Sequence, residues 1–233
     1  MFTNSSSFSN SVDAAFLYIT GLAAIVFIGI VIAMIYFIVK YGRKKNPVPK
    51  NIEGNTALEV TWTLVPLVLF MSMFYFGWEG YRDMRNIPKD AMVIKITARM
   101  WQWGFEYPNG LQTDTLYVPV GKAIRGDLKS VDVNHSFYIP AFRVKRDALP
   151  NRANNVWFRP EKTGVYDIAC AEYCGLKHSY MYSKIYVMEQ KDYDRWYAQA
   201  SRKAGKATAR DTTQSAPGAV ASRDTASTRT AAF

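Results

Sequence analysis

The sequence has very few of the residues that bind soft metals or form disulfides. Its 233 residues include only two cysteines and two histidines. Two cysteines are too few for a disulfide-stabilised scaffold. Any site made of thiol and imidazole groups must therefore use Cys170, Cys174, His135 and His178. The sequence Cys-x-x-Cys-His is also absent, which excludes a covalently attached c-type haem in this chain.

The globular part of the sequence lacks any long run of lysine and arginine. The formal net charge is +10, and an excess of this size can indicate nucleic-acid binding. However, the densest group of positive charges, Lys40 to Lys50, lies between two apolar segments. We therefore expect a lipid bilayer as a partner and no nucleic acid.

Charge is absent from residues 14–39, a run of 26 positions. A membrane-spanning helix needs about 20 apolar residues. A signal peptide would have a shorter apolar core of about 7–15 residues behind a basic start, whereas the only charge in residues 1–13 is the negative Asp13. The pattern predicts a first transmembrane helix over residues 14–39.

A second uncharged run of 19 residues covers positions 60–78, with Pro66 near its start, where proline disturbs a helix least. We expect it to be the return helix of a hairpin, over residues 59–81. The intervening residues 40–58 contain five positive charges, whereas residues 1–13 contain none. By the positive-inside rule, the loop is cytoplasmic, and both termini lie on the periplasmic side of a bacterial-type inner membrane.

After the second apolar run the composition changes. Short stretches rich in Val, Ile, Tyr and Trp, such as 92–97, 153–158, 165–169 and 183–188, alternate with Pro- and Gly-containing turns. This pattern predicts an all-β sandwich or barrel, which we place at residues 82–200. Residues 201–233 are a low-complexity tail. From about Ala204, Ala, Thr, Ser, Gly and Arg dominate, and we expect disorder or ordering only against a partner.

All four cysteine and histidine residues fall into one plausible ligand set. Cys170, Cys174 and His178 lie in one short segment that also contains Met181, and His135 lies upstream. Two thiolates, two imidazoles and a thioether favour copper over hard cations. Structural zinc on the cysteines and histidines, or a simple disulfide, are the alternatives. One loop plus a distant histidine is also the layout of copper sites at one end of a cupredoxin β-sandwich.

The segment from Cys170 to Met181, with His135 upstream in Asp-Val-Asn-His-Ser-Phe, closely resembles the CuA motif of cytochrome oxidase subunit II. The resemblance covers about residues 58–187. It implies a two-helix transmembrane hairpin followed by an all-β cupredoxin-like Greek-key sandwich, which contains a dinuclear copper centre. In that centre the sulfurs of Cys170 and Cys174 would bridge two coppers. The remaining ligands implied by the resemblance are His135, His178, Met181 and the backbone carbonyl of Glu172.

The resemblance also implies roles for residues outside this loop. The carboxylate of Glu172 would reach a Mg²⁺ or Mn²⁺ ion at the boundary with subunit I. Trp101, in Trp-Gln-Trp-Gly-Phe-Glu-Tyr-Pro, matches the tryptophan that receives electrons, although Gln102 stands where the family commonly has an aromatic residue. Glu59 matches the glutamate at the mouth of a proton channel. A further similar loop, residues 145–152, has Asn151 where glycine is usual.

The function implied by the resemblance is that of subunit II of a respiratory terminal oxidase. Such a subunit accepts electrons one at a time from a cytochrome c-type donor and passes them to the haem of subunit I. Oxygen is reduced to water there, with coupled proton pumping, so the oxygen chemistry belongs to another subunit. The CuA subunit of a nitric oxide reductase-type complex is the alternative. A quinol oxidase subunit is disfavoured because that class lacks the copper ligands.

The charge of the predicted β domain bears on the electron donor. Residues 90–188 contain thirteen lysine and arginine residues against nine aspartate and glutamate residues, a net charge of +4. Oxidases that use a basic soluble cytochrome c usually present an acidic patch, since complementary potentials speed the encounter. A basic domain favours a less basic donor, such as one held in a supercomplex.

Overall fold

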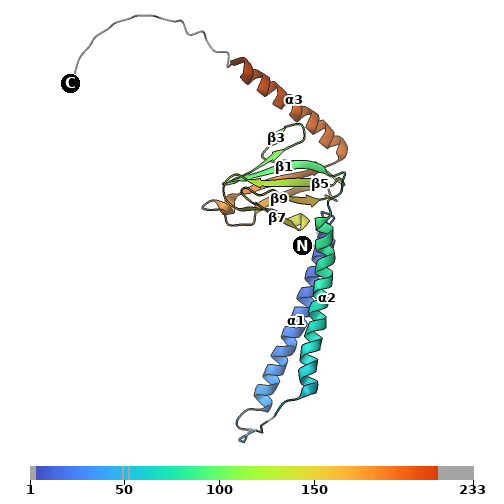
Figure 1. Ribbon diagram of the computed structural model, residues 1–233, viewed down its shortest axis with the longest axis vertical. Coiled ribbons are helices and arrows are strands. Elements are labelled where there is room, and N and C mark those ends of the chain that lie inside the picture. Colours follow the sequence, from blue (N-terminus) through green and yellow to red (C-terminus); the bar gives the residue numbers. More distant parts are fainter. Residues whose placement is uncertain (1–3, 49, 52, 215–233) are drawn as a thin grey trace, which may run out of the picture.

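The computed structural model describes residues 4–48, 50–51 and 53–214. Two long helices form a hairpin below a β domain, and a third helix crosses the far side of that domain (Figure 1). The first two helices are α1, Ser9–Lys40, and α2, Thr56–Arg85. Both are long and apolar enough to cross a membrane, and their apolar stretches are exposed. At 1.5 Å per residue, each is about 45 Å long.

The hairpin helices begin and end beyond the predicted spans of 14–39 and 59–81, because polar residues continue each helix past its charge-free run. The side chain of Asn55 caps α2 by accepting a hydrogen bond from the Leu58 amide at 3.1 Å. Midway along the hairpin, the Tyr18 and Ser72 hydroxyls are 2.6 Å apart. The Tyr18 ring also packs on Phe76, with centroids 4.8 Å apart. These contacts hold the two helices side by side.

The β domain consists of two five-stranded sheets. The first has the order β3-β2-β1-β5-β8, with β1 Met92–Arg99, β2 Gln102–Glu106, β3 Gln112–Thr113, β5 Ile124–Ser130 and β8 Asn154–Phe158. The second has the order β4-β10-β9-β6-β7, with β4 Leu116–Pro119, β6 His135–Ile139, β7 Val144–Ala148, β9 Gly164–Cys170 and β10 Tyr182–Met188. All four strand segments singled out in the sequence lie in these sheets. The fold class, a two-helix hairpin followed by an all-β domain, is confirmed.

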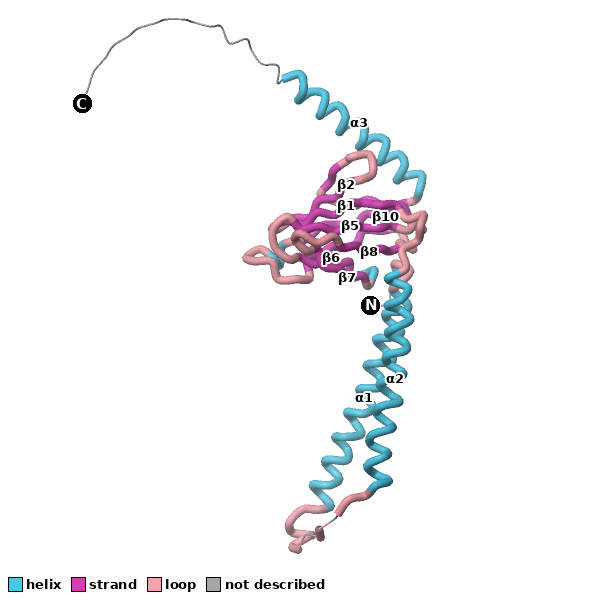
Figure 2. Tube along the Cα trace, in the orientation of Figure 1, coloured by secondary structure: helices cyan, strands magenta, loops and turns pink. Residues whose placement is uncertain are grey.

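Alternation along the strands builds the core between the sheets. In β1, Ile94, Ile96 and Ala98 are buried, whereas Lys95 on the opposite face is exposed. Large aromatic side chains from both sheets fill the same interior, among them Phe105 and Phe137. This rigid core positions the loops at each end of the sandwich (Figure 2).

The N-terminal segment joins the hairpin to the β domain. The Ser7 amide donates to the Arg159 carbonyl at 3.1 Å, and the Glu161 amide donates to the Ser5 carbonyl at 2.9 Å. The Phe8 ring meets Trp157 edge-on, with centroids 4.7 Å apart. These contacts attach the beginning of α1 to the end of β8.

Helix α3, Gln190–Gln214, is an element that the sequence analysis does not predict. Tyr193, Trp196, Tyr197 and Ala200 follow helical spacing and pack against the β domain. The helix extends into the segment that we expected to be an unstructured tail. Its composition accounts for the difference, since alanine has the highest helix propensity. The part of that tail from residue 215 onward lies outside the described residues.

Candidate metal centre

Neighbouring strands of the second sheet bring the predicted ligands together. Cys170 ends β9, and His135 begins β6, which pairs with β9 through Phe137 and Cys170. Cys174 lies in the following loop, which projects from the end of the sandwich farthest from the junction with α2 (Figure 1). Residues His178–Tyr180 form a short 3₁₀ helix, and Met181 directly precedes β10.

The potential ligand atoms lie close to one another. The sulfurs of Cys170 and Cys174 are 3.8 Å apart. His135 Nδ1 lies 3.8 Å from the Cys170 sulfur, and His178 Nδ1 lies 3.5 Å from the Cys174 sulfur. The Met181 sulfur is 3.8 Å from that of Cys174. Each cysteine thus has its own histidine, and the two sulfurs lie between them.

The carbonyl of Glu172 also faces this cluster, since its oxygen lies 3.2 Å from the Cys170 sulfur. The Glu172 residue itself is exposed. His135, Cys174 and Met181 are buried, and Cys170 and His178 are partly buried. The donor set is therefore partly shielded from solvent and partly open to it.

These distances suit metal binding better than a disulfide. A sulfur–sulfur bond is about 2.05 Å long, and both cysteines are free in the structure. Metal–sulfur and metal–nitrogen bonds of about 2.0–2.3 Å place two donors of one ion about 3–4 Å apart, which the spacings above match. The ligand atoms of His135, Cys170 and Cys174 all lie within 4.8 Å of one another, but His178 does not join this group. A single tetrahedral zinc would require all four within reach, so the layout fits two metals better than one.

Asp132 fixes the orientation of the His135 ring. Its Oδ1 accepts a hydrogen bond from His135 Nε2–H at 2.8 Å, which leaves Nδ1 facing Cys170. Oδ1 also accepts from the Val133 amide at 2.7 Å, and Oδ2 accepts from the Met100 amide at 2.7 Å. Burial alone would raise the pKa of Asp132, but these donors together lower it to about 2. The sequence analysis assigns this aspartate no role, although it stands three residues before a predicted ligand.

The thiol of Cys174 lies in an environment that disfavours its ionisation. Burial, and after it the neighbouring Cys170, raises the pKa of Cys174 to about 12. A thiolate rather than a thiol binds metals, so a metal must displace the proton. An ion that binds here must therefore compete with the proton for the Cys174 sulfur.

Trp101 lies directly beside the ligand loop. Its indole Nε1–H donates a hydrogen bond to the Cys174 carbonyl at 3.1 Å. Gly175 has a φ of +112°, and a Cβ there would come within 3.4 Å of the Trp101 ring. A larger residue at this position would be strained and would crowd the indole. The local backbone therefore holds the ring against the donor set.

Trp103 is a second tryptophan next to the site that the sequence analysis assigns no role. It is buried, and its ring meets His135 edge-on with centroids 6.2 Å apart. Glu59 lies elsewhere, exposed in the first turn of α2, at the end of the hairpin far from the β domain (Figure 1). The structure thus gathers the six predicted metal ligands and Trp101 in one place and keeps Glu59 apart. The segment 145–152 is only partly a loop, because its first four residues belong to β7; in the loop that follows, Asn151 has a left-handed φ of +57°, which glycine adopts without strain.

Comparison with known proteins gives matches at both ends of the chain. A family model described as the transmembrane domain of cytochrome c oxidase subunit II matches residues 1–77. A second model, described as the periplasmic domain of the same subunit, matches residues 109–188. Together they cover α1, most of α2 and the ligand loop.

Individual relatives agree with the family models. Cytochrome c oxidase subunit 2 of Cereibacter sphaeroides is 29% identical over 223 residues, which cover 78% of this chain and 74% of the relative. The subunit from Alkalihalophilus pseudofirmus is 34% identical over 190 residues, 76% of this chain and 56% of the relative. Among solved structures, the periplasmic domain of subunit II from Bradyrhizobium japonicum is 35% identical. That match covers 51% of this chain and 99% of the solved chain, with a TM-score of 0.49.

Proposed function

Because this chain belongs to the cytochrome c oxidase subunit II family, we propose that it receives electrons for a haem–copper oxidase at a dinuclear CuA centre. The observation that carries the proposal is the pair of cysteine sulfurs 3.8 Å apart, each with its own histidine. A thioether and a backbone carbonyl complete the soft donor set.

The proposed ligands are His135, Cys170, Glu172 through its carbonyl, Cys174, His178 and Met181. When bound to these residues, the copper pair would supply a carrier for one electron at a time. The protein's own part is to keep the donors in place. Asp132 holds the His135 ring by its Nε2–H, and the rigid strands β6 and β9 fix the positions of the first histidine and the first cysteine.

Trp101 is proposed as the residue through which electrons reach the site. Its indole contacts the ligand loop through the Cys174 carbonyl, and the residue is only partly buried, so the ring spans the distance from surface to donors. Electrons then pass to the haem of subunit I, where oxygen is reduced to water with proton pumping. The oxygen chemistry belongs to that subunit.

Two acidic residues are proposed to serve the rest of the complex. The exposed carboxylate of Glu172 is available to a Mg²⁺ or Mn²⁺ ion at the boundary with subunit I. Glu59, exposed in the first turn of α2, is proposed to stand at the mouth of the proton channel. Both roles rest on the family resemblance.

The proposed placement follows the distribution of charge. Helices α1 and α2 span a bacterial-type inner membrane, with the basic loop between them in the cytoplasm and the β domain on the periplasmic side. The domain boundaries expected from the sequence remain a proposal, in which the β domain starts at residue 82, whereas α2 continues to Arg85 and β1 begins at Met92. Its partners are subunit I, other oxidase subunits and a cytochrome c-type donor, which a supercomplex could hold in place.

The proposal is tested with the full chain purified in detergent and reconstituted with copper. We expect two copper ions per chain, and we expect the single substitutions Cys170→Ser and Cys174→Ser each to abolish the pair. Thr113→Ser, a conservative change away from the donors, should leave the metal content unchanged. Full copper loading of either cysteine variant would contradict the assignment of bridging sulfurs.

A further inference from the structure

The surface around Trp101 has an exposed apolar centre. Leu176 is 87% exposed, Val131 is 58% exposed, and Met100, directly before Trp101, is 44% exposed. Leu176 follows the glycine that lies against the indole, and the Val131 amide donates to the Ala98 carbonyl at the same end of β1. Clustered apolar exposure of this kind marks interaction sites. We call Met100, Trp101, Val131 and Leu176 the Trp101 face.

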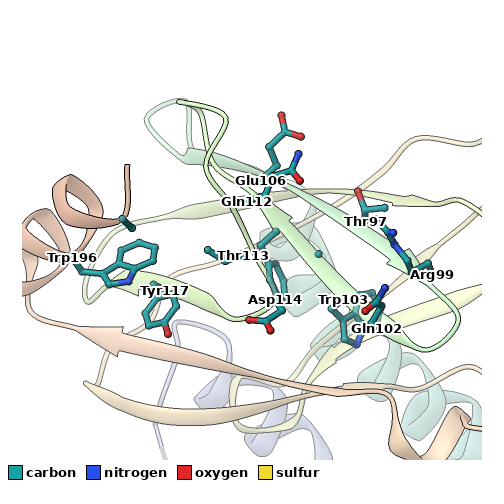
Figure 3. A pocket seen from close by; sticks show the side chains of 13 residues that line it. Thr97, Arg99, Gln102, Trp103, Glu106, Gln112, Thr113, Asp114, Tyr117 and Trp196 are labelled. Atoms are coloured by element: carbon teal, nitrogen blue, oxygen red, sulfur yellow. The ribbon is translucent and has the colours of Figure 1, made fainter. Parts of the chain in front are cut away.

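Three cations lie on the chain segments next to the Trp101 face. Lys177 Nζ lies 5.9 Å from the centroid of the Trp101 ring. Arg99 lies two residues before Trp101, and Lys129 is the register partner of Thr97 on the neighbouring strand. Figure 3 shows Arg99 and Gln102 together at the end of a cleft of about 660 Å³ on the outer face of the first sheet, away from Trp196.

The nearby carboxylates do not neutralise these cations. On the same sheet, Glu106 is paired with Lys95 at 2.6 Å, and Asp127 is paired with Arg125 at 2.7 Å. Asp132 turns inward to His135. Within residues 4–48, 50–51 and 53–214, no carboxylate oxygen lies within 4.0 Å of the charged groups of the three cations.

Two further carboxylates lie in the neighbourhood of the Trp101 face. Asp114 lines the same cleft as Arg99, and Glu172 lies on the ligand loop. With the partly exposed Asp132, the nearby carboxylates equal the three cations in number. However, the charged group that the structure places over the indole is Lys177. The charge directly at the exposed ring is therefore positive.

We propose that the Trp101 face docks a c-type cytochrome whose own docking surface is acidic, and that it disfavours a lysine-rich cytochrome c. The inference rests on the proposed role of Trp101 and adds the chemistry of the partner. An exposed apolar centre excludes water at contact, and the cations around it steer an acidic partner toward the indole. Lys177 is the central residue of this selection, because it lies over the ring that the partner must reach.

The experiment compares two donors that carry the same haem and differ in charge. One is a lysine-rich soluble cytochrome c, and the other is the same protein after succinylation of its lysines. The acceptor is the copper-loaded full chain in detergent, and stopped-flow absorbance gives the second-order rate constant of its reduction. Salt is varied from about 10 mM to about 300 mM, which shortens the Debye length from about 30 Å to below 8 Å.

At low salt we expect the succinylated cytochrome to react at least tenfold faster than the unmodified one, and its rate constant to fall as salt is added. The rate constant of the unmodified cytochrome should rise or stay level with salt. A faster reaction of the unmodified cytochrome that slows steeply with salt would overturn the proposal.

Charge-reversed variants localise the effect. Lys177→Glu, alone and with Arg99→Glu, should reverse the preference between the two donors while the copper content and the copper absorption spectrum remain unchanged. Lys122→Glu is the matched control, because Lys122 lies two residues before Ile124, at the opposite end of the β1–β5 pair. Strand geometry places it about 20 Å away. An equal effect of Lys122→Glu and Lys177→Glu would show that only total charge matters and would overturn the docking surface.

Failure of the underlying function has a different signature. If neither cytochrome reduces a chain that holds its two coppers, the proposed electron-accepting role of this chain fails, and the docking proposal fails with it. If both cytochromes reduce it at equal rates and equal salt dependence, electron acceptance stands and the charge selection is wrong.

Discussion

Replacing Asp132 with asparagine tests how the protein positions His135. The carboxylate accepts charge-assisted hydrogen bonds from His135 Nε2–H, the Val133 amide and the Met100 amide, and a longer one from the Ser130 hydroxyl. An asparagine side chain has one acceptor oxygen and places an NH₂ group where the other oxygen was, so at least one donor loses its partner. A hydrogen bond to a charged group contributes about 1.5–3 kcal/mol. We expect Asp132→Asn to lower the free energy of unfolding by about 2–3 kcal/mol.

The same change should weaken copper binding. Loss of the carboxylate that orients a metal-binding histidine typically lowers metal affinity about 10- to 100-fold. Affinity is measured by competition with a copper chelator, and stability by urea unfolding followed through tryptophan fluorescence. Asp167→Asn is the matched control, since Asp167 pairs with Lys184 at the surface and such pairs contribute about 0–1 kcal/mol. If Asp132→Asn binds copper as tightly as Asp167→Asn does, the positioning argument is wrong.

Four further predictions follow from the structure. Trp101→Phe removes the hydrogen bond to the Cys174 carbonyl and the indole itself, so stopped-flow reduction should slow sharply while the copper content stays at two per chain. Because burial raises the pKa of the Cys174 thiol to about 12, copper loading at neutral pH must release its proton. Copper affinity should therefore rise about tenfold per pH unit for each thiol proton released, which chelator competition from pH 6 to pH 8 checks, and a flat profile would contradict it. Arg143→Gln breaks the 2.8 Å ion pair with Asp13, whose side chain is only 10% exposed. It should lower the free energy of unfolding in urea by about 2–3 kcal/mol, a larger loss than that caused by Lys184→Gln at the surface. Trp196→Ala removes a ring that stacks on Tyr117 at 4.2 Å, so α3 should become sensitive to limited proteolysis, and wild-type resistance would refute that packing.

The hairpin and the candidate ligand residues can both be picked out from the sequence, because each depends on the scarcity of one kind of residue. Charge is missing from two long runs, and only four cysteine and histidine residues exist to bind a soft metal. The ends of the helices are less predictable. Asp13 is charged and was expected outside the membrane helix, but it lies within α1, where Arg143 of the β domain pairs with it. That partner is 130 residues away, and the pairing depends on how the domain sits on the hairpin.

Helix α3 shows a different limit of sequence reasoning. The end of α3 has a low-complexity composition, which is typical of a disordered tail. At its start, Tyr193, Trp196 and Tyr197 have the spacing of one face of an amphipathic helix. Those aromatic residues become significant only once Tyr107 and Tyr117 offer a surface to pack on. The arrangement of sulfurs and imidazoles is also tertiary. The sequence names the candidate ligands, but the pairing of β6 with β9 decides that His135 meets Cys170, whereas Cys174 and His178 meet within one loop.

Electron paramagnetic resonance of the oxidised, copper-loaded full chain tests the central claim most directly. Two coppers that share one unpaired electron give hyperfine splitting from two equivalent nuclei. Metal analysis of the same sample should give two coppers per chain. We predict that spectrum, and we predict its loss in Cys170→Ser. A spectrum of one isolated copper, or a colourless protein that holds a single zinc or a disulfide, would contradict the assignment.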